Sequence, residues 1–236
     1  MIRAGLRKGA RVLEIGCGTG SMTTWLSQTV GKNGQVIAVD VSEKQIEIAR
    51  KAAEESQLTN IEFICSTIEE FELSGNLVDL VYSRLLLMHL KDPMRILKKL
   101  QSCLRSGGVI ACEEPHASSL ITTPRNEYIE RLNNMFLELG KLQGLDFNIG
   151  DKLLPMIKLA GYSGAHGCFV QPVILMAEAI EFVLMSATEV APFAIKYGLV
   201  SEIEAQKMLN ELTNSEFDEN SFYTFPRQAQ IFGYKQ

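Results

Sequence analysis

The chain has 236 residues, of which 46% are hydrophobic and 22% are charged, an ordinary globular composition that excludes a disordered or fibrous chain. Its net charge of −5 is spread without long single-sign runs, which argues against a nucleic-acid partner and for a small one. The apolar runs are far shorter than the roughly 18 residues of a membrane span and no signal peptide precedes them, so we expect a cytoplasmic protein.

The cysteines argue against both a disulfide framework and a metal site. They are odd in number and contain no C-x-x-C pair, which a zinc site or a redox motif would favour. They are Cys17, Cys65, Cys103, Cys112 and Cys168. We therefore expect no metal, while the composition leaves a homodimer open.

The first half of the chain alternates short strand patterns with longer helical ones, which predicts βαβ units and a parallel sheet. The strand patterns are almost continuously apolar, as expected for strands that are covered on both faces. They are Arg11–Ile15, Gln35–Asp40, Ile61–Cys65, Val78–Tyr82 and Gly108–Cys112. Between them, Ser42 followed by Gln45 predicts a helix start, and Pro93 fits the first turn of another helix.

The second half, after Pro115, predicts mostly helices with two further strands. Gly161 is typical of a residue that ends a helix, and Pro226 predicts an irregular start or a sheet edge for the last strand. We expect helices over Arg125–Leu142, Asp151–Ala160, Ala177–Val190 and Ser201–Thr213, and strands over Gly167–Leu175 and Tyr223–Tyr234.

A glycine-rich turn follows the first strand. Gly16, Gly18 and Gly20 place backbone amides and a helix start at the carboxyl edge of the sheet, where open α/β sheets bind ligands. Asp40, at the end of the next strand, is positioned to accept hydrogen bonds from ribose hydroxyls. Ser21 stands where the dinucleotide pattern requires its third glycine, so the turn favours a nucleoside, with an NAD-dependent oxidoreductase as the weaker alternative.

Four segments in chain order resemble the motifs of class I S-adenosylmethionine-dependent methyltransferases. They are Val12–Gly20, Val36–Ser42, Val78–Pro93 and Leu104–Ile110. The resemblance implies a single α/β domain over 1–236, with a doubly wound, mostly parallel seven-stranded sheet of the Rossmann-like kind and an antiparallel last strand. Residues 1–114 would form the cofactor-binding half. Residues 115–236 would form a helical cap plus the last two strands, as in small-molecule methyltransferases of this family.

The same resemblance implies the residues that bind the cofactor. Glu14, Gly16, Cys17, Gly18 and Gly20 would surround its amino-acid part, Asp40 its ribose and Val41 its adenine. Thr67 and Ile68 would lie at the adenine, with Thr67 where the family usually has an aspartate, and Ser83 and Arg84 would lie beside the sulfonium.

The expected reaction is methyl transfer from S-adenosylmethionine to a small-molecule acceptor by in-line displacement, leaving S-adenosylhomocysteine. Glu114 and His116, at the end of the fifth strand, are the candidates for accepting a proton or orienting the acceptor. Adjacent carboxylates at such a position are as often solvated or capping groups. A catalytically inactive, methyltransferase-like binding or accessory protein is the main alternative function.

Overall fold

The computed structural model describes residues 5–236, which form two compact units. The sheet unit comprises the chain up to Glu114 together with Asp151–Cys168 and Ala229–Gln236. The helical unit comprises Pro115–Gly150 and Phe169–Gln228. Each unit has its own hydrophobic core. The chain first passes into the helical unit after Glu114. It returns to the sheet unit twice, at Asp151 and at Ala229.

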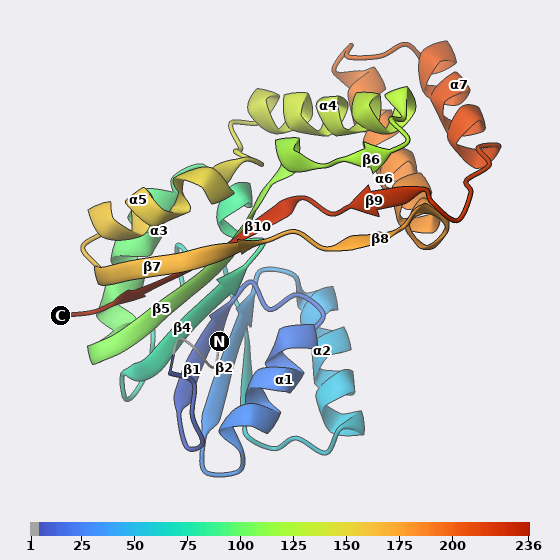
Figure 1. The fold of residues 1–236 in the computed structure, drawn as a ribbon. Helices are drawn as coiled ribbons and strands as arrows, with labels where there is room; N and C mark the ends of the chain where they lie inside the picture. The colour runs from blue at the N-terminus through green and yellow to red at the C-terminus, as the bar shows by residue number, and fades with distance from the viewer. Residues whose placement is uncertain (1–4) are drawn as a thin grey trace. The chain divides into compact units, whose positions relative to one another are not determined.

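The sheet unit is built on a seven-stranded sheet with the order β3-β2-β1-β4-β5-β10-β7 (Figure 1). Strands β1 to β5 pair in parallel, and β10 is antiparallel, which confirms the predicted fold class. The strands are β1 (Arg11–Ile15), β2 (Gln35–Asp40), β3 (Ile61–Cys65), β4 (Val78–Arg84), β5 (Leu104–His116), β7 (Ser163–Val170) and β10 (Arg227–Tyr234).

Helices cover both faces of this sheet, with α1 and α2 on one face and α3 and α5 on the other (Figure 1). Because both faces are covered, β1 and β2 are buried along nearly their whole length. The helices are α1 (Ser21–Val30), α2 (Glu43–Glu55), α3 (Pro93–Leu100) and α5 (Leu153–Leu159), with short 3-10 turns η2 (Leu87–His89), η3 (Gln101–Cys103) and η5 (Ile149–Lys152).

Local capping explains where two of these helices begin. The hydroxyl of Ser42 accepts a hydrogen bond from the amide of Gln45 at the start of α2, as the sequence predicts. The carboxylate of Asp92 accepts from the amide of Arg95 at the start of α3, where Pro93 occupies the first turn. These caps fix the loops that follow β2 and β4.

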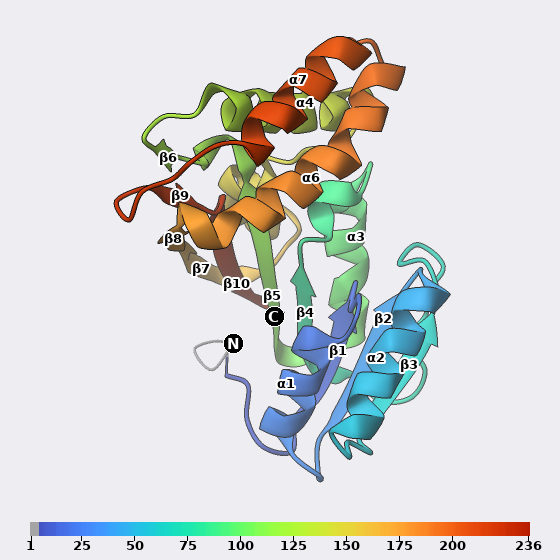
Figure 2. The same cartoon turned by 90° about the vertical axis from the view of Figure 1, so that its right-hand side faces the viewer.

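The helical unit packs three helices and a small antiparallel sheet, of order β6-β9-β8, around one core (Figure 2). An Asn126 cap starts its first helix, and a capping box of Ser201 and Glu204 starts its last. The elements are α4 (Glu127–Leu142), α6 (Met176–Lys196), α7 (Glu202–Thr213), β6 (Thr122–Thr123), β8 (Val173–Leu175), β9 (Phe222–Thr224) and the 3-10 turn η4 (Ala117–Ser119).

Several predicted elements have other bounds in the structure. The strand predicted over Gly167–Leu175 is divided into β7 and β8, and the strand predicted over Tyr223–Tyr234 into β9 and β10. The second break falls at Phe225 and Pro226, because proline has no amide for the ladder. Helix α6 continues past Val190 to Lys196, since its later alanines remain buried.

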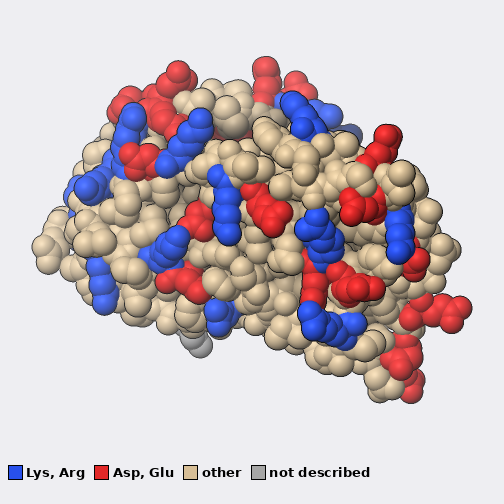
Figure 3. Space-filling model, turned by 90° about the horizontal axis from the view of Figure 1, so that it is seen from above, with Lys and Arg blue, Asp and Glu red and all other residues tan. Residues whose placement is uncertain are grey.

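Two further features concern the hydrophobicity of the helices and the charge of the surface. Among the described residues, no helix has the combined length and hydrophobicity that crossing a membrane requires. Lysine and arginine side chains are interspersed with aspartate and glutamate over most of the face seen in Figure 3. That face therefore presents charges of both signs rather than one basic stripe.

Candidate functional site

The glycine-rich turn joins β1 to α1 with three glycines at positive φ. Gly16 has φ 72°, Gly18 φ 55° and Gly20 φ 85°, a backbone region that other residues rarely adopt. A Cβ on Gly20 would lie 2.8 Å from Cβ of Ala49 on α2, and one on Gly16 would lie 3.2 Å from Cδ1 of Leu86. The turn thus needs glycine both for its conformation and for the close approach of neighbouring elements.

Asp40 ends β2 with its carboxylate directed at this turn. Its Oδ2 accepts a hydrogen bond from the amide of Gly18 at 2.8 Å, and its Oδ1 accepts from the amide of Ser42 at 2.9 Å. A carboxylate offers about four acceptor positions, so each oxygen retains capacity for a ligand hydroxyl. Val41, the next residue, is 67% exposed and presents an apolar side chain beside that carboxylate.

Glu14 lies almost completely buried on β1, one residue before the strand ends. Thr23 of α1 donates its hydroxyl to Oε2 of Glu14 at 2.6 Å. Burial raises the pKa of Glu14 to about 7, opposed by the Thr23 hydrogen bond and the charge of Arg84. Arg84 also donates to the Ser21 hydroxyl at 3.1 Å, which links the end of β4 to the start of α1.

The other predicted binding residues follow β3 and end β4. The Thr67 hydroxyl accepts from the amide of Glu70 at 3.2 Å, and Ile68 is buried. Ser83 is fully buried between Ile15 and Cys112 of the neighbouring strands. Of these side chains, Arg84 is exposed, whereas Ser83 faces the interior of the sheet unit.

Glu114 is placed differently from a solvent-facing base. It is fully buried on β5, and its Oε1 accepts from the amides of Leu86 at 3.0 Å and Leu87 at 2.7 Å. Its Oε2 accepts from the amide of Met88 at 3.3 Å. The carboxylate is therefore committed to the backbone after β4. His116 ends β5 and is half-buried.

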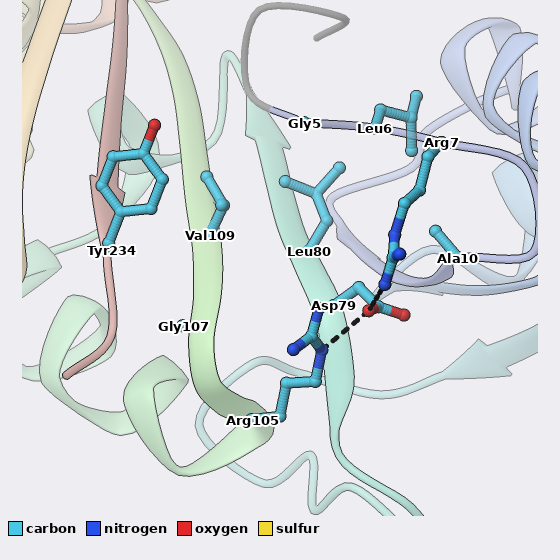
Figure 4. A pocket seen from close by; sticks show the side chains of 10 residues that line it. All are labelled: Gly5, Leu6, Arg7, Ala10, Asp79, Leu80, Arg105, Gly107, Val109 and Tyr234. Atoms are coloured by element: carbon cyan, nitrogen blue, oxygen red, sulfur yellow. Dashed lines mark hydrogen bonds and ion pairs between the residues drawn. The ribbon is translucent and has the colours of Figure 1, made fainter.

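A separate pocket lies at the amino ends of the strands, opposite the glycine-rich turn (Figure 4). There Asp79, near the start of β4, accepts from the Arg105 guanidinium at 2.7 Å and the Arg7 guanidinium at 3.4 Å. Because parallel strands present their carboxyl ends at the other edge, this pocket is distinct from the glycine-rich turn. The Asp79 cluster ties strands together and lies away from the candidate site.

Family membership follows from a match of residues 6–161 to the family model of the methyltransferase domain. This match spans all the motifs and most of the sheet unit. The chain belongs to the class I S-adenosylmethionine-dependent methyltransferase family.

Relatives and solved structures agree with this family. A demethylmenaquinone methyltransferase from Geobacillus sp. is 29% identical over 121 residues, which cover 51% of this chain and 52% of that protein. The chain thus spans about half the length of the curated relatives it matches. YcgJ from Bacillus subtilis has a similar fold, with a TM-score of 0.66 and 16% identity over 100% of this chain and 95% of that chain.

A second solved structure, a putative methyltransferase from Bacillus halodurans, has a TM-score of 0.64 and 18% identity over 100% of this chain and 96% of that chain. At such identities the structures support the methyltransferase fold alone. The residues around the glycine-rich turn must therefore support any statement about ligands.

Several residues of this methyltransferase-family site were not identified from the sequence. Thr23 and Ser21 on α1 contact Glu14 and Arg84, and Leu86 packs next to Gly16. The spacing of Glu14 and Thr23, nine residues apart across a tight turn, was the one local signal available. The apolar run that contains Leu86 indicates core or pocket wall, but its contact with Gly16 depends on how β1 and β4 pair.

Proposed function

We propose that this chain transfers a methyl group from S-adenosylmethionine to a small-molecule acceptor and releases S-adenosylhomocysteine. The observation that carries the proposal is the pair Glu14 and Asp40 beside three positive-φ glycines at the carboxyl ends of β1 and β2. Backbone amides, a helix start and two carboxylates match the amino acid and ribose of this cofactor.

The residues present fit the parts of the cofactor. We assign the Asp40 carboxylate to the ribose hydroxyls, because it has acceptor capacity beyond its two amide bonds. The exposed side chain of Val41 is assigned to the adenine face. The glycines, with Glu14 and Cys17, are assigned to the amino-acid part, because they surround the turn between the carboxyl end of β1 and the start of α1.

The remaining predicted residues receive narrower roles. Thr67 and Ile68 are assigned to the adenine edge, where a hydroxyl replaces the usual carboxylate. Ser83 and Arg84 are assigned to the sulfonium end; Ser83 is buried, so its contribution would be to the shape of the site. His116 is the candidate to accept the proton of an oxygen or nitrogen acceptor.

The chemistry requires little of the protein beyond binding, alignment and water exclusion. Bound S-adenosylmethionine would supply an electrophilic methyl carbon on a sulfonium, which leaves as a neutral thioether. The names of the relatives make demethylmenaquinone the first acceptor to assay. We extend to this chain only the broader class, a small-molecule acceptor.

The proposal is tested by calorimetry with S-adenosylmethionine, S-adenosylhomocysteine and NAD, followed by product formation with a panel of small acceptors. We expect binding of the first two ligands, no binding of NAD, and methylation of at least one acceptor. Binding of NAD alone would overturn the proposal. Cofactor binding without turnover on any acceptor would favour an accessory protein. In the assay, His116→Ala should lower kcat while the affinity for S-adenosylhomocysteine stays unchanged.

A further inference from the structure

The turn after β4 is held by consecutive backbone amides that all donate to the end of β5. The amide of Leu85 donates to the carbonyl of Glu113 at 2.9 Å. The next three amides, of Leu86, Leu87 and Met88, donate to the carboxylate of Glu114. One buried side chain thus accepts three of these four hydrogen bonds.

The backbone of this turn adopts a conformation that needs external support. Leu85 has φ 55°, in the left-handed region that a leucine rarely occupies. Such residues persist when the surrounding contacts over-determine them, and they cluster at ligand sites. The Glu114 carboxylate, with its bonds to the three following amides, provides that support.

The turn after β4 packs against the glycine-rich turn. The side chain of Leu86 lies so close to Gly16 that a Cβ there would meet its Cβ, Cδ1 and Cδ2 at 3.2 to 3.4 Å. Arg84, just before the turn, contacts Ser21 at the start of α1. A displacement of the turn would therefore be felt directly at Gly16.

We propose that Glu114 is a positioning residue, whose carboxylate holds the turn of Leu85–Met88 so that Leu86 packs against Gly16 and shapes the cofactor site. This inference rests on the proposed function, because it takes the glycine-rich turn as the cofactor site. In this role Glu114 supports the turn. It does not contact the methyl acceptor and does not take a proton from it.

The ionisation of Glu114 gives the inference a second readout. Burial raises its pKa to about 7, and the three amide bonds oppose that rise. Protonation puts a donor on one oxygen, where three amides need acceptors, so cofactor affinity should fall as the pH drops below about 7.

The other titratable groups on the elements around Glu114 leave this effect visible. Burial favours the neutral forms of both Cys112 and His89, because it raises the pKa of the thiol and lowers the pKa of the imidazole. Glu113 points to the opposite face of β5, where Tyr82 and Gln230 donate to it. Glu14 has a pKa of about 7, so wild type must be compared with a Glu114 variant to separate the two carboxyls.

The experiment measures the affinity for S-adenosylhomocysteine by calorimetry at pH 6 and pH 8. Glu114→Gln keeps the size of the side chain but faces one amide with an NH2 group. We expect this variant to bind about tenfold more weakly at pH 8, and to show a smaller change in affinity between the two pH values than wild type. Glu113→Gln, on the same strand with the opposite orientation, should bind as wild type does. Thermal unfolding checks that each variant is folded.

Leu86→Ala is the second variant, because it removes the wall while leaving the Glu114 hydrogen bonds in place. This variant should also weaken binding of S-adenosylhomocysteine. If Glu114→Gln does not fold, Leu86→Ala alone tests the inference. A folded Glu114→Gln with wild-type affinity and pH dependence would overturn the inference, as would unchanged affinity in Leu86→Ala. If wild type itself fails to bind, the proposed function fails and the inference with it; if wild type binds and the variants match it, the inference fails alone.

Discussion

Asp40 shows how single residues of this site are oriented in advance. Both of its carboxylate oxygens are held by backbone amides, one from the glycine-rich turn and one from the start of α2. A side chain fixed in this way loses little conformational freedom when a ligand binds. In the proposed ribose role, its remaining acceptor positions would hold the hydroxyls.

Asp40→Asn tests this role directly. The variant should bind S-adenosylhomocysteine more weakly by about 1.5 to 3 kcal/mol for each charge-assisted bond that is lost. Calorimetry measures the change. The control is Glu47→Gln, which removes an exposed carboxylate from α2, the helix that follows β2. It should leave the affinity unchanged. Equal affinities for the two variants would remove Asp40 from the ribose site.

For single residues, the sequence predicts the features that depend on residues nearby in the chain. The positive-φ glycines and the acidic end of β2 follow from a strand, a tight turn and a second strand in a fixed order. The surroundings of Glu114 and Leu86 do not, because their partners lie 26 to 28 positions away for Glu114 and 70 positions away for Leu86. Only the pairing of β4 with β5 and with β1 brings them together.

At the scale of elements, the approach of α1 to α2 depends on Gly20. This residue starts α1 in a left-handed conformation, and its missing Cβ leaves room for Ala49 of α2. The two helices flank the turn that we assign to the cofactor. Their separation therefore affects both stability and the shape of the site.

Gly20→Ala should lower the free energy of unfolding by about 2 to 3 kcal/mol, from backbone strain plus the clash with Ala49. Gly198→Ala is the matched control, because Gly198 has φ 71° but no atom within 4 Å of the Cβ position. Its loss should be about 1 kcal/mol, from strain alone. Chemical denaturation compares the two, and equal losses would show that the contact with Ala49 costs nothing.

Elements with continuous apolar patterns were predicted better than those with mixed patterns. Strands β1, β2 and β3 have the predicted bounds. For β1 and β2, burial on both faces leaves a plain signal. Strand β7 is largely exposed, so its pattern merged with that of β8. Pro226 indicated an irregularity, but the sequence did not reveal that separate sheets begin on its two sides.

At the scale of the whole sheet unit, Asp79 joins three segments that are distant in sequence. It accepts hydrogen bonds from the Arg11 amide at the start of β1, from Arg105 on β5, and from Arg7. Burial alone raises the pKa of Asp79, but the Arg11 amide and the Arg105 guanidinium outweigh it and lower the pKa below its usual value. The ionised form therefore stabilises the folded state.

Because the folded-state pKa of Asp79 is lowered, its contribution is present above the unfolded pKa and is lost as the pH falls through the folded one. Asp79→Asn should lower the free energy of unfolding by about 1 kcal/mol at pH 7, and the difference from wild type should close at an acidic pH below the folded-state pKa of Asp79. Denaturation at both pH values measures this. Glu72→Gln, which removes the exposed partner of Lys99, should change little at either pH. A gap for Asp79→Asn that persists at low pH would contradict the argument.

The position of β10 between β5 and β7 has a consequence during biosynthesis. Every other strand of this sheet is translated earlier, yet β5 and β7 cannot acquire their shared neighbour until residues 227–234 have left the ribosome. Until then, each of the two strands has an unpaired edge, which is a template for pairing with another nascent chain. We therefore expect nascent chains that stall before residue 227 to need chaperones most.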